Sequence, residues 1–70
     1  MKVTVVMNGS DWEGLYIDGK LKIQKERIGE ADIEEVFKAE YERRYCDPQH
    51  HKFRVLPENM DEVKWASWDK

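Results

Sequence analysis

Alternating apolar and polar positions predict strands in the first third of the chain. Residues 3–7 (VTVVM) are β-branched almost throughout and end at the turn formers of residues 8–10. Residues 12–17 (WEGLYI) and 20–24 (KLKIQ) flank an Asp-Gly pair. An Asp-Gly pair between β-prone segments favours a two-residue hairpin, because both positions tolerate positive φ. We therefore predict three strands, the last two joined by a tight turn.

The predicted hairpin has two different sides. With residues 18 and 19 as the loop, the cross-strand pairs are Ile17 with Lys20, Tyr16 with Leu21, Leu15 with Lys22 and Gly14 with Ile23. Paired residues share a face, so one side holds the core candidates Trp12, Tyr16, Leu21 and Ile23. The other side holds Leu15, Ile17, Lys20 and Lys22. This second side is half apolar and half basic, and we expect another layer of the protein or a partner to cover it.

A helical pattern follows in the middle of the chain. Asp32, with Glu35 three residues later, is a variant of the capping box and predicts a helix start. Apolar positions then recur at helical spacing, at Ile33, Val36, Phe37, Tyr41 and Tyr45. Acidic residues crowd the first turn and basic residues the last, as the helix macrodipole favours. We predict a helix over residues 32–45, ended before Pro48.

The C-terminal third is less regular. Residues 52–57 (KFRVLP) alternate and end in proline, which is typical of a short strand at a sheet edge. Two alternatives stay open for residues 58–70: a short helix lined by Met60, Val63 and Trp68, or a strand in which Val63, Trp65 and Ser67 alternate. We expect a turn of helix or an irregular segment that folds Trp65 back over the core.

The predicted order is strand, strand, strand, helix, strand. A helix across one face of a small antiparallel sheet of three to four strands is the simplest way to bury both apolar stripes. The sequence therefore predicts an α+β fold in a single domain that comprises residues 1–70.

The size of the chain limits its stability. A core of 70 residues seldom contributes more than about 3–5 kcal/mol, so small domains often add disulfides, a metal or a partner chain. Cys46 is the sole cysteine, which excludes an internal disulfide. Three Trp, three Tyr and two Phe supply material for a good core.

The sequence also favours a soluble protein of the cytoplasm. No apolar run approaches the roughly 18 residues of a membrane span, and the start lacks the features of a secretory signal. A lone thiol is typical of a reducing compartment. We expect a cytoplasmic location and no membrane contact.

One loop offers candidate metal ligands. Cys46, His50 and His51 could supply a thiolate and two imidazoles to zinc. Structural zinc sites usually draw two ligand pairs from separate segments, and no second Cys or His pair exists in this sequence. The main expectation is therefore no metal and no cofactor, with a small zinc-binding domain as the alternative.

The sequence shows no catalytic constellation. Cys46 as a nucleophile would need a base within reach and an oxyanion site, and the end of the predicted helix disfavours its thiolate. The four glycines are isolated and form no phosphate-binding loop. We expect a protein that is not an enzyme, and we keep a role as an accessory to one as a weak alternative.

Charge argues against nucleic acid as the expected partner. The formal net charge is −3, and the mild basic bias is confined to the hairpin. Non-specific affinity for nucleic acid comes mostly from neutralised phosphates. A nucleic-acid-binding accessory protein therefore remains only a weaker alternative.

Recognition of another protein is the leading hypothesis. Trp and Tyr are enriched at binding hot spots, and an edge strand can accept a strand from a neighbour. The candidate partner-binding residues are Leu15, Ile17, Lys20, Lys22, Trp65 and Trp68. We expect the partner to be another protein or a second copy in a homodimer.

Two stretches carry a resemblance. The hairpin W-E-G-L-Y-x-D-G-K-L at residues 12–21 and L-P-E-N-M at 56–60 resemble short uncharacterised proteins of bacteria and phages. The resemblance transfers no activity and no site residue. It implies a phage or mobile-element protein that binds or inhibits a host protein, in line with a small non-enzymatic interaction module.

Overall fold

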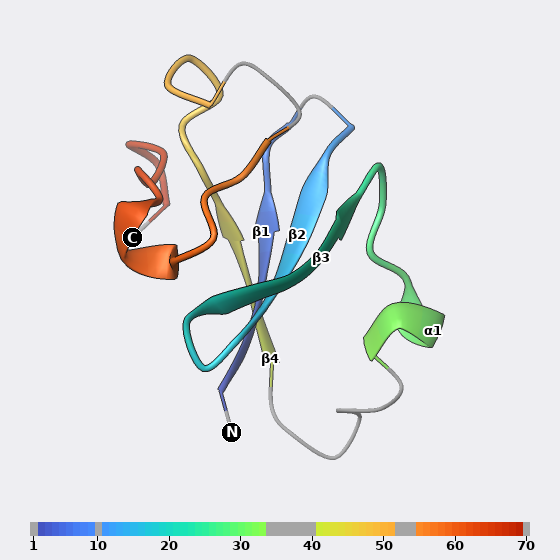
Figure 1. The fold of residues 1–70 in the computed structure, drawn as a ribbon. Coiled ribbons are helices and arrows are strands. Elements are labelled where there is room, and N and C mark those ends of the chain that lie inside the picture. The colour runs from blue at the N-terminus through green and yellow to red at the C-terminus, as the bar shows by residue number, and fades with distance from the viewer. Residues whose placement is uncertain (1, 10, 34–40, 52–54, 70) are drawn as a thin grey trace.

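Four strands form one mixed sheet in the computed structural model, which describes residues 2–9, 11–33, 41–51 and 55–69. The strands are β1 (Val3–Met7), β2 (Glu13–Ile17), β3 (Lys20–Lys25) and β4 (Tyr41–Tyr45), in the sheet order β3-β2-β1-β4 (Figure 1). A short helix, α1 (Glu30–Ile33), follows β3, and a 3-10 turn, η2 (Met60–Glu62), follows β4. The chain therefore has a small α+β fold, as predicted.

The predicted two-residue hairpin joins β2 to β3. Asp18 has φ 51° and Gly19 has φ 83°, the two positive values that a tight hairpin loop of this length requires. Ile17 pairs with Lys20, and Tyr16 pairs with Leu21. The turn chemistry of the Asp-Gly pair thus sets the first two pairs of the ladder.

A β-bulge changes the rest of the predicted register. Tyr16 pairs with Leu21, but the next residue of β2, Leu15, pairs with Ile23, so Lys22 has no partner in the ladder. The predicted pairs of Leu15 with Lys22 and Gly14 with Ile23 are wrong. A bulge inserts one extra residue and moves the following side chains to the opposite face. Ile23 consequently packs on the same side of the sheet as Leu15.

The start of α1 differs from the prediction by two residues. The helix begins at Glu30, so Asp32 lies inside its first turn. The Asp32 carboxylate accepts a hydrogen bond from the Gly29 N–H at 2.8 Å and another from Lys25 Nζ at 3.1 Å. Asp32 therefore reaches back to the residue before the helix, as the acid at the third position of a capping box does.

The second half of the predicted helix is a strand. Residues 41–45 form β4, which pairs parallel to β1, and residues 34–40 lie outside the described residues. The sheet is therefore mixed rather than wholly antiparallel. Helix propensity is a weak prior that tertiary pairing overrides, and the tyrosines at both ends of this segment suit a strand. Pairing with β4 fills the second edge of β1.

The sheet has an apolar cluster on each face. The helix-side core consists of Val3, Val5, Leu15, Ile28 and Ile33. The strap-side core consists of Val6, Tyr16, Cys46, Leu56 and Val63. Consecutive residues of β1 alternate between the two clusters, which is why its sequence is an almost unbroken apolar run. The sheet is thus the middle layer of three.

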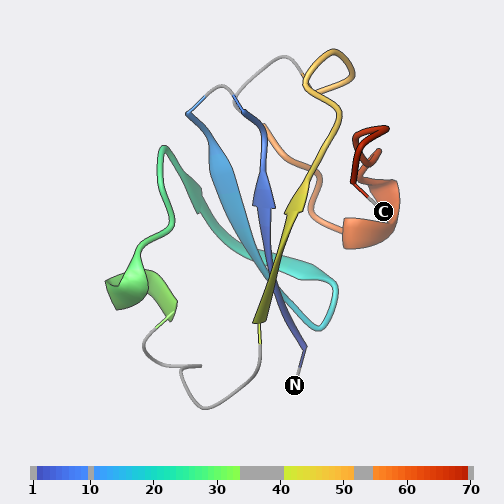
Figure 2. The same ribbon diagram turned by 180° about the vertical axis from the view of Figure 1, so that it is seen from behind.

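Residues 55–69 form the outer layer on one face, and we call them the C-terminal strap. At one end the strap pairs with β3 through the bridge between Lys20 and Asn59. At the other end it pairs with Cys46, the residue after β4, through the bridge between Cys46 and Trp65. The strap and α1 lie at opposite sides of the sheet (Figure 2).

The structure of the strap differs in part from the prediction for the C-terminal third. No strand is assigned to residues 55–57, so the predicted strand is wrong there, and residues 52–54 lie outside the described part. The expected turn of helix is present as the 3-10 turn η2. Trp65 is half-buried against the strap-side core, so it folds back over the core as expected.

Within the described ranges, no helix has the length and apolar character to cross a bilayer.

Replacing Gly14 by alanine should lower the free energy of unfolding by about 1–3 kcal/mol, the usual penalty for overpacking a core. A Cβ at position 14 would lie 2.6 Å from Leu56 Cδ1 and 3.2 Å from Leu21 Cδ1. Urea unfolding measures the change. The matched control is Gly29→Ala, whose Cβ would have its nearest neighbour, an Asp32 oxygen, at 3.8 Å. Equal losses in the two variants would contradict this account of Gly14.

Candidate interaction surface at the edge of β4

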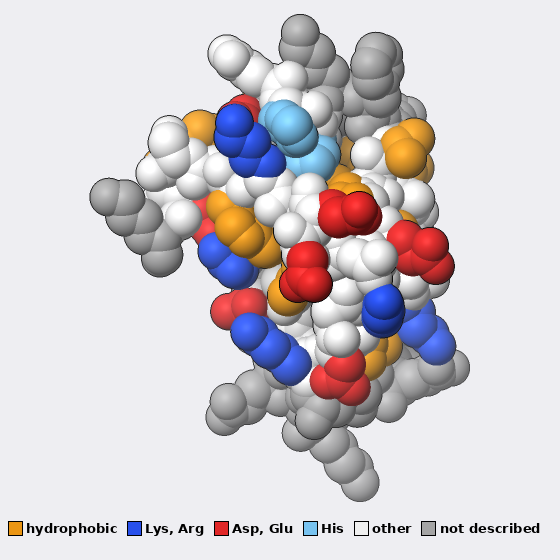
Figure 3. Space-filling view, turned by 60° about the vertical axis from the view of Figure 1, so that its left-hand side comes forward, with side chains coloured by type: hydrophobic (Ala, Val, Ile, Leu, Met, Phe, Trp, Pro, Cys, Tyr) orange, Lys and Arg blue, Asp and Glu red, His pale blue; other side chains and the backbone are white. Residues whose placement is uncertain are grey.

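The side of the molecule that carries the strap has a mixed charge pattern. Figure 3 shows acidic and basic side chains interspersed there, with apolar side chains in separate spots between them. The described residues in this view form no field of one sign that would attract a phosphate backbone. A candidate binding surface lies instead at the edge of the sheet, on β4.

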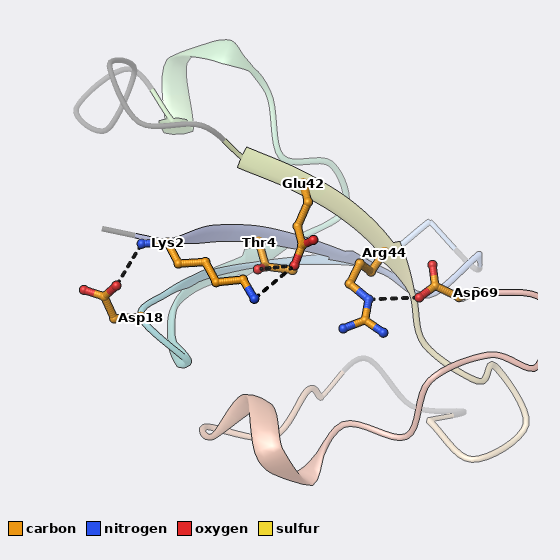
Figure 4. Close-up of polar contacts among 6 residues, drawn as sticks. All are labelled: Lys2, Thr4, Asp18, Glu42, Arg44 and Asp69. Atoms are coloured by element: carbon orange, nitrogen blue, oxygen red, sulfur yellow. Dashed lines mark hydrogen bonds and ion pairs between the residues drawn. The ribbon is translucent and has the colours of Figure 1, made fainter.

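The even-numbered charges of β4 are neutralised within the protein. The Glu42 carboxylate accepts a hydrogen bond from Thr4 Oγ1 at 3.2 Å and lies 3.7 Å from Lys2 Nζ (Figure 4). Arg44 Nε donates to Asp69 Oδ2 at 2.9 Å. The Arg44 guanidinium also lies 3.7 Å from the centroid of the Trp65 ring. These contacts fix β4 to β1 and to the strap.

The odd-numbered side chains of β4 lie on the opposite face and are open to solvent. Tyr41 is 48% exposed and Tyr45 is 42% exposed. Arg43 is also exposed; its guanidinium carbon lies 5.9 Å from the Tyr41 ring centroid, and its Nη1 lies 3.8 Å from the sulfur of Met7. No carboxylate of the described residues forms an ion pair with Arg43. The face thus presents two aromatic rings and a cation that no carboxylate of the described residues neutralises.

The main chain of β4 is open at two positions. Cys46 N–H donates to the Met7 carbonyl, which places the main-chain groups of the even-numbered residues toward β1. The groups of Tyr41, Arg43 and Tyr45 therefore point away from the sheet. Tyr45 is satisfied, because its N–H donates to Asp69 Oδ1 at 3.0 Å and its carbonyl accepts from Ala66 N–H at 2.9 Å. Among described residues, no hydrogen-bond partner faces the outward groups of Tyr41 and Arg43.

Trp68 extends this region onto the strap. Its side chain is 63% exposed, and its ring centroid lies 6.4 Å from that of Tyr45 at a tilt of 51°. We call Tyr41, Arg43, Tyr45 and Trp68 the β4 surface. All four belong to the residue types that dominate binding hot spots. The arrangement can bind a protein segment through rings, a cation and open main-chain groups together.

A hollow adjoins the β4 surface beside Tyr45. Its volume is about 190 Å³, and Met7, Trp12 and Glu13 contribute to its lining. Pockets that hold drug-sized ligands usually measure about 300–1,000 Å³. The hollow is therefore smaller than a pocket for a drug-sized ligand and has room for about one side chain.

The hairpin residues predicted to bind a partner are distributed differently. Leu15 is 1% exposed and belongs to the helix-side core, and Ile17 is half-buried. Lys20 donates a hydrogen bond to Asn59 Oδ1 at the end of the strap, and Lys22 is exposed at the bulge. Of the two expected covers for this face, another layer of the protein is the one that buries Leu15.

The two predicted tryptophans separate. Trp65 lies beneath the Arg44 guanidinium and against the strap-side core, so it holds the strap in place. Trp68 stands outside the core next to Tyr45. Of the pair, Trp68 is the one that the structure brings to the β4 surface.

The candidate zinc ligands are engaged elsewhere. Cys46 is buried in the strap-side core, and burial raises the pKa of its thiol. His51 Nε2 accepts a hydrogen bond from the Lys64 N–H at 3.0 Å, so this nitrogen is not free to bind a metal. The His50 and His51 rings lie with centroids 4.7 Å apart. In the described ranges, no three His, Cys, Asp or Glu side chains are grouped to hold a metal ion.

Tyr41, Arg43 and Tyr45 were absent from the predicted site residues. The spacing of the two tyrosines also fits one face of a helix, and the arginines fit its C-terminal end. The available signal was the β propensity of tyrosine at both ends of a five-residue segment. That signal is weak without knowledge that β1 has a free edge.

No protein-family model, curated protein or solved structure matches this chain. The resemblance of residues 12–21 and 56–60 to short bacterial and phage proteins therefore stays a prediction.

The strap should loosen at mildly acidic pH through His51. Burial, with a smaller contribution from the neighbouring His50, lowers the pKa of His51 below its usual value, and its neutral ring accepts the Lys64 N–H. The stabilisation is complete above the unfolded pKa of about 6.5 and is lost as the pH falls through the folded pKa. The urea midpoint should therefore drop between about pH 7.5 and about pH 5.5.

The matched variants for this test are His51→Gln and His50→Gln. The decrease should be smaller in His51→Gln, which removes the titrating group. It should largely remain in His50→Gln, because His50 contributes less than burial to the shift. An unchanged pH dependence in His51→Gln would show that another group is responsible.

Proposed function

We propose that this chain is a non-enzymatic protein-interaction module that binds another protein through the β4 surface. The observation that carries the proposal is the grouping of Tyr41, Arg43, Tyr45 and Trp68 beside open main-chain groups. Exposed large aromatic side chains that gather in one place are typical of binding sites.

The rigidity of β4 supports this proposal. Glu42 is held by Thr4 and Lys2, and Arg44 is held by Asp69 and Trp65. Because these contacts hold the strand in place, its main chain loses little freedom when a partner binds. A pre-organised surface of this kind lowers the entropic cost of association.

The environment of Cys46 and the size of the hollow support a binding role over an enzymatic one. The thiol of Cys46 is buried and its pKa is raised, which is the opposite of what a nucleophilic cysteine needs. The hollow beside Tyr45 is small, and the described residues bring no metal-binding group together. These observations favour recognition of a protein surface over chemistry on a bound substrate.

The proposed setting is a reducing compartment, the cytoplasm, because the buried Cys46 is unpaired. By the resemblance of the hairpin, the proposed partner is a host protein that a phage or mobile-element protein binds or inhibits. Both statements extend the binding proposal.

The test compares Trp68→Ala with Val55→Ala. Both side chains are mostly exposed, at 63% and 69%, but only Trp68 belongs to the β4 surface. A partner captured from source-cell extract should be retained by Val55→Ala and lose about tenfold or more in affinity for Trp68→Ala. Thermal melting should show that both variants fold. Equal retention by the two variants, or no retained partner at all, would contradict the proposal.

A further inference from the structure

We infer that β4 accepts an extended segment of the partner as an additional strand, and that this segment carries an acidic residue opposite Arg43. This inference rests on the proposed function and specifies which kind of segment the partner presents. It combines two independent observations on the residues that the structure describes: the main-chain groups of β4 that bond to none of them, and the charge of Arg43, which forms an ion pair with none of them.

The open main-chain groups define the place and the length of the added strand. Tyr41 and Arg43 each direct an N–H and a carbonyl away from β1, and no described residue bonds to them. Such an edge accepts a peptide through main-chain hydrogen bonds. Pairing must end before Tyr45, because Ala66 and Asp69 occupy its main-chain groups. The occupant is therefore a short extended segment.

The charge of Arg43 defines the chemistry of the occupant. Glu42 and Arg44 already have partners of opposite charge inside the protein, in Lys2 and Asp69. Arg43 contacts only the Tyr41 ring and the Met7 sulfur among described residues. A residue directly opposite Arg43 on an added strand shares its face, where opposite charges attract and like charges repel. An acidic residue at that position completes the surface.

A second copy of this chain fits the edge less well. Two-fold symmetric pairing of two β4 strands is antiparallel. If the open positions of both copies face each other, Tyr41 pairs with Arg43 of the second copy, and Glu42 lies directly opposite its own equivalent. The next register places Arg43 opposite its equivalent and also requires the occupied main chain of Tyr45. Each register opposes like charges, which destabilises a sheet pair.

The test uses two capped eight-residue peptides of alternating threonine and valine. One carries glutamate at a central position and the other carries lysine there. The glutamate peptide should bind the full chain about fivefold tighter. It should slow hydrogen exchange at the amides of Tyr41 and Arg43, measured by NMR. The amides of Glu42 and Arg44 should change little, because they already face β1.

Three variants separate charge from main-chain pairing. Arg43→Glu should reverse the preference, so that the lysine peptide binds tighter. Arg43→Gln should remove the preference but keep the protection of the Tyr41 amide. Arg43→Pro removes the outward N–H of position 43 and should abolish binding of both peptides; proline is tolerated on edge strands. If Arg43→Pro does not fold, the comparison of Arg43→Glu with Arg43→Gln still decides.

Several results would overturn the inference. Equal affinity for both peptides, or protection of amides away from Tyr41 and Arg43, would exclude the acidic added strand. Sedimentation that shows dimers, with these two amides protected in proportion to dimer content, would identify a second copy as the occupant. If Trp68→Ala loses the captured partner but neither peptide slows hydrogen exchange at the Tyr41 amide, strand addition is excluded and the proposed function is retained.

Discussion

The burial of β1 on both faces is the constraint on which the rest of this structure depends. Val5 and Val6 are fully buried although their side chains point to opposite sides of the sheet. A strand of this kind needs an apolar layer above and below it and a neighbour at each edge. β2 and β4 supply the edges, the residues around α1 cover one face, and the strap covers the other. The short chain thereby builds two small cores around one strand.

The strap is an irregular segment that hydrogen bonds hold against the sheet. Its main chain bonds to β3 through Leu21 N–H and Glu58, and to β4 through Ala66 N–H and Tyr45. The Tyr16 hydroxyl donates to the Pro57 carbonyl from the buried side. These hydrogen bonds, together with the buried side chains of Leu56, Val63 and Ala66, make the strap part of the fold. Its attachment to Tyr45 also decides how much of the β4 edge stays open.

Local chemistry predicted those parts of the fold that depend on neighbouring residues. The hairpin follows from the backbone freedom of Asp18 and Gly19, and the return of Trp65 over the core follows from its apolar ring. The bulge at Lys22 was not predictable, because a one-residue slip is decided by which side of the sheet needs Ile23. Tyr41–Tyr45 was read as helix because its partner, β1, lies about forty residues away in sequence.

The candidate site residues also divide into those predictable from neighbouring residues and those that depend on distant pairing. Trp65 and Trp68 were predicted from residue type and charged neighbours, and the structure leaves only Trp68 largely exposed, beside Tyr45. For the side that holds Leu15, a further layer of the protein and a partner both stayed open, because the covering residues Ile28 and Ile33 come from another segment. Arg43 acquires its role only when β4 forms an edge. Residues whose role depends on long-range pairing are thus the ones that local patterns miss.

The closure of Tyr45 by the strap has a consequence for colloidal behaviour. Fibrils grow when segments of about six residues stack edge to edge without interruption. The open edge of β4 has two positions, Tyr41 and Arg43, one of which carries a charge that identical stacked molecules would repeat at close range. A short open edge with a charged side chain is one of the devices by which proteins limit edge-to-edge pairing. We therefore expect the strap to limit the stacking of identical molecules along β4.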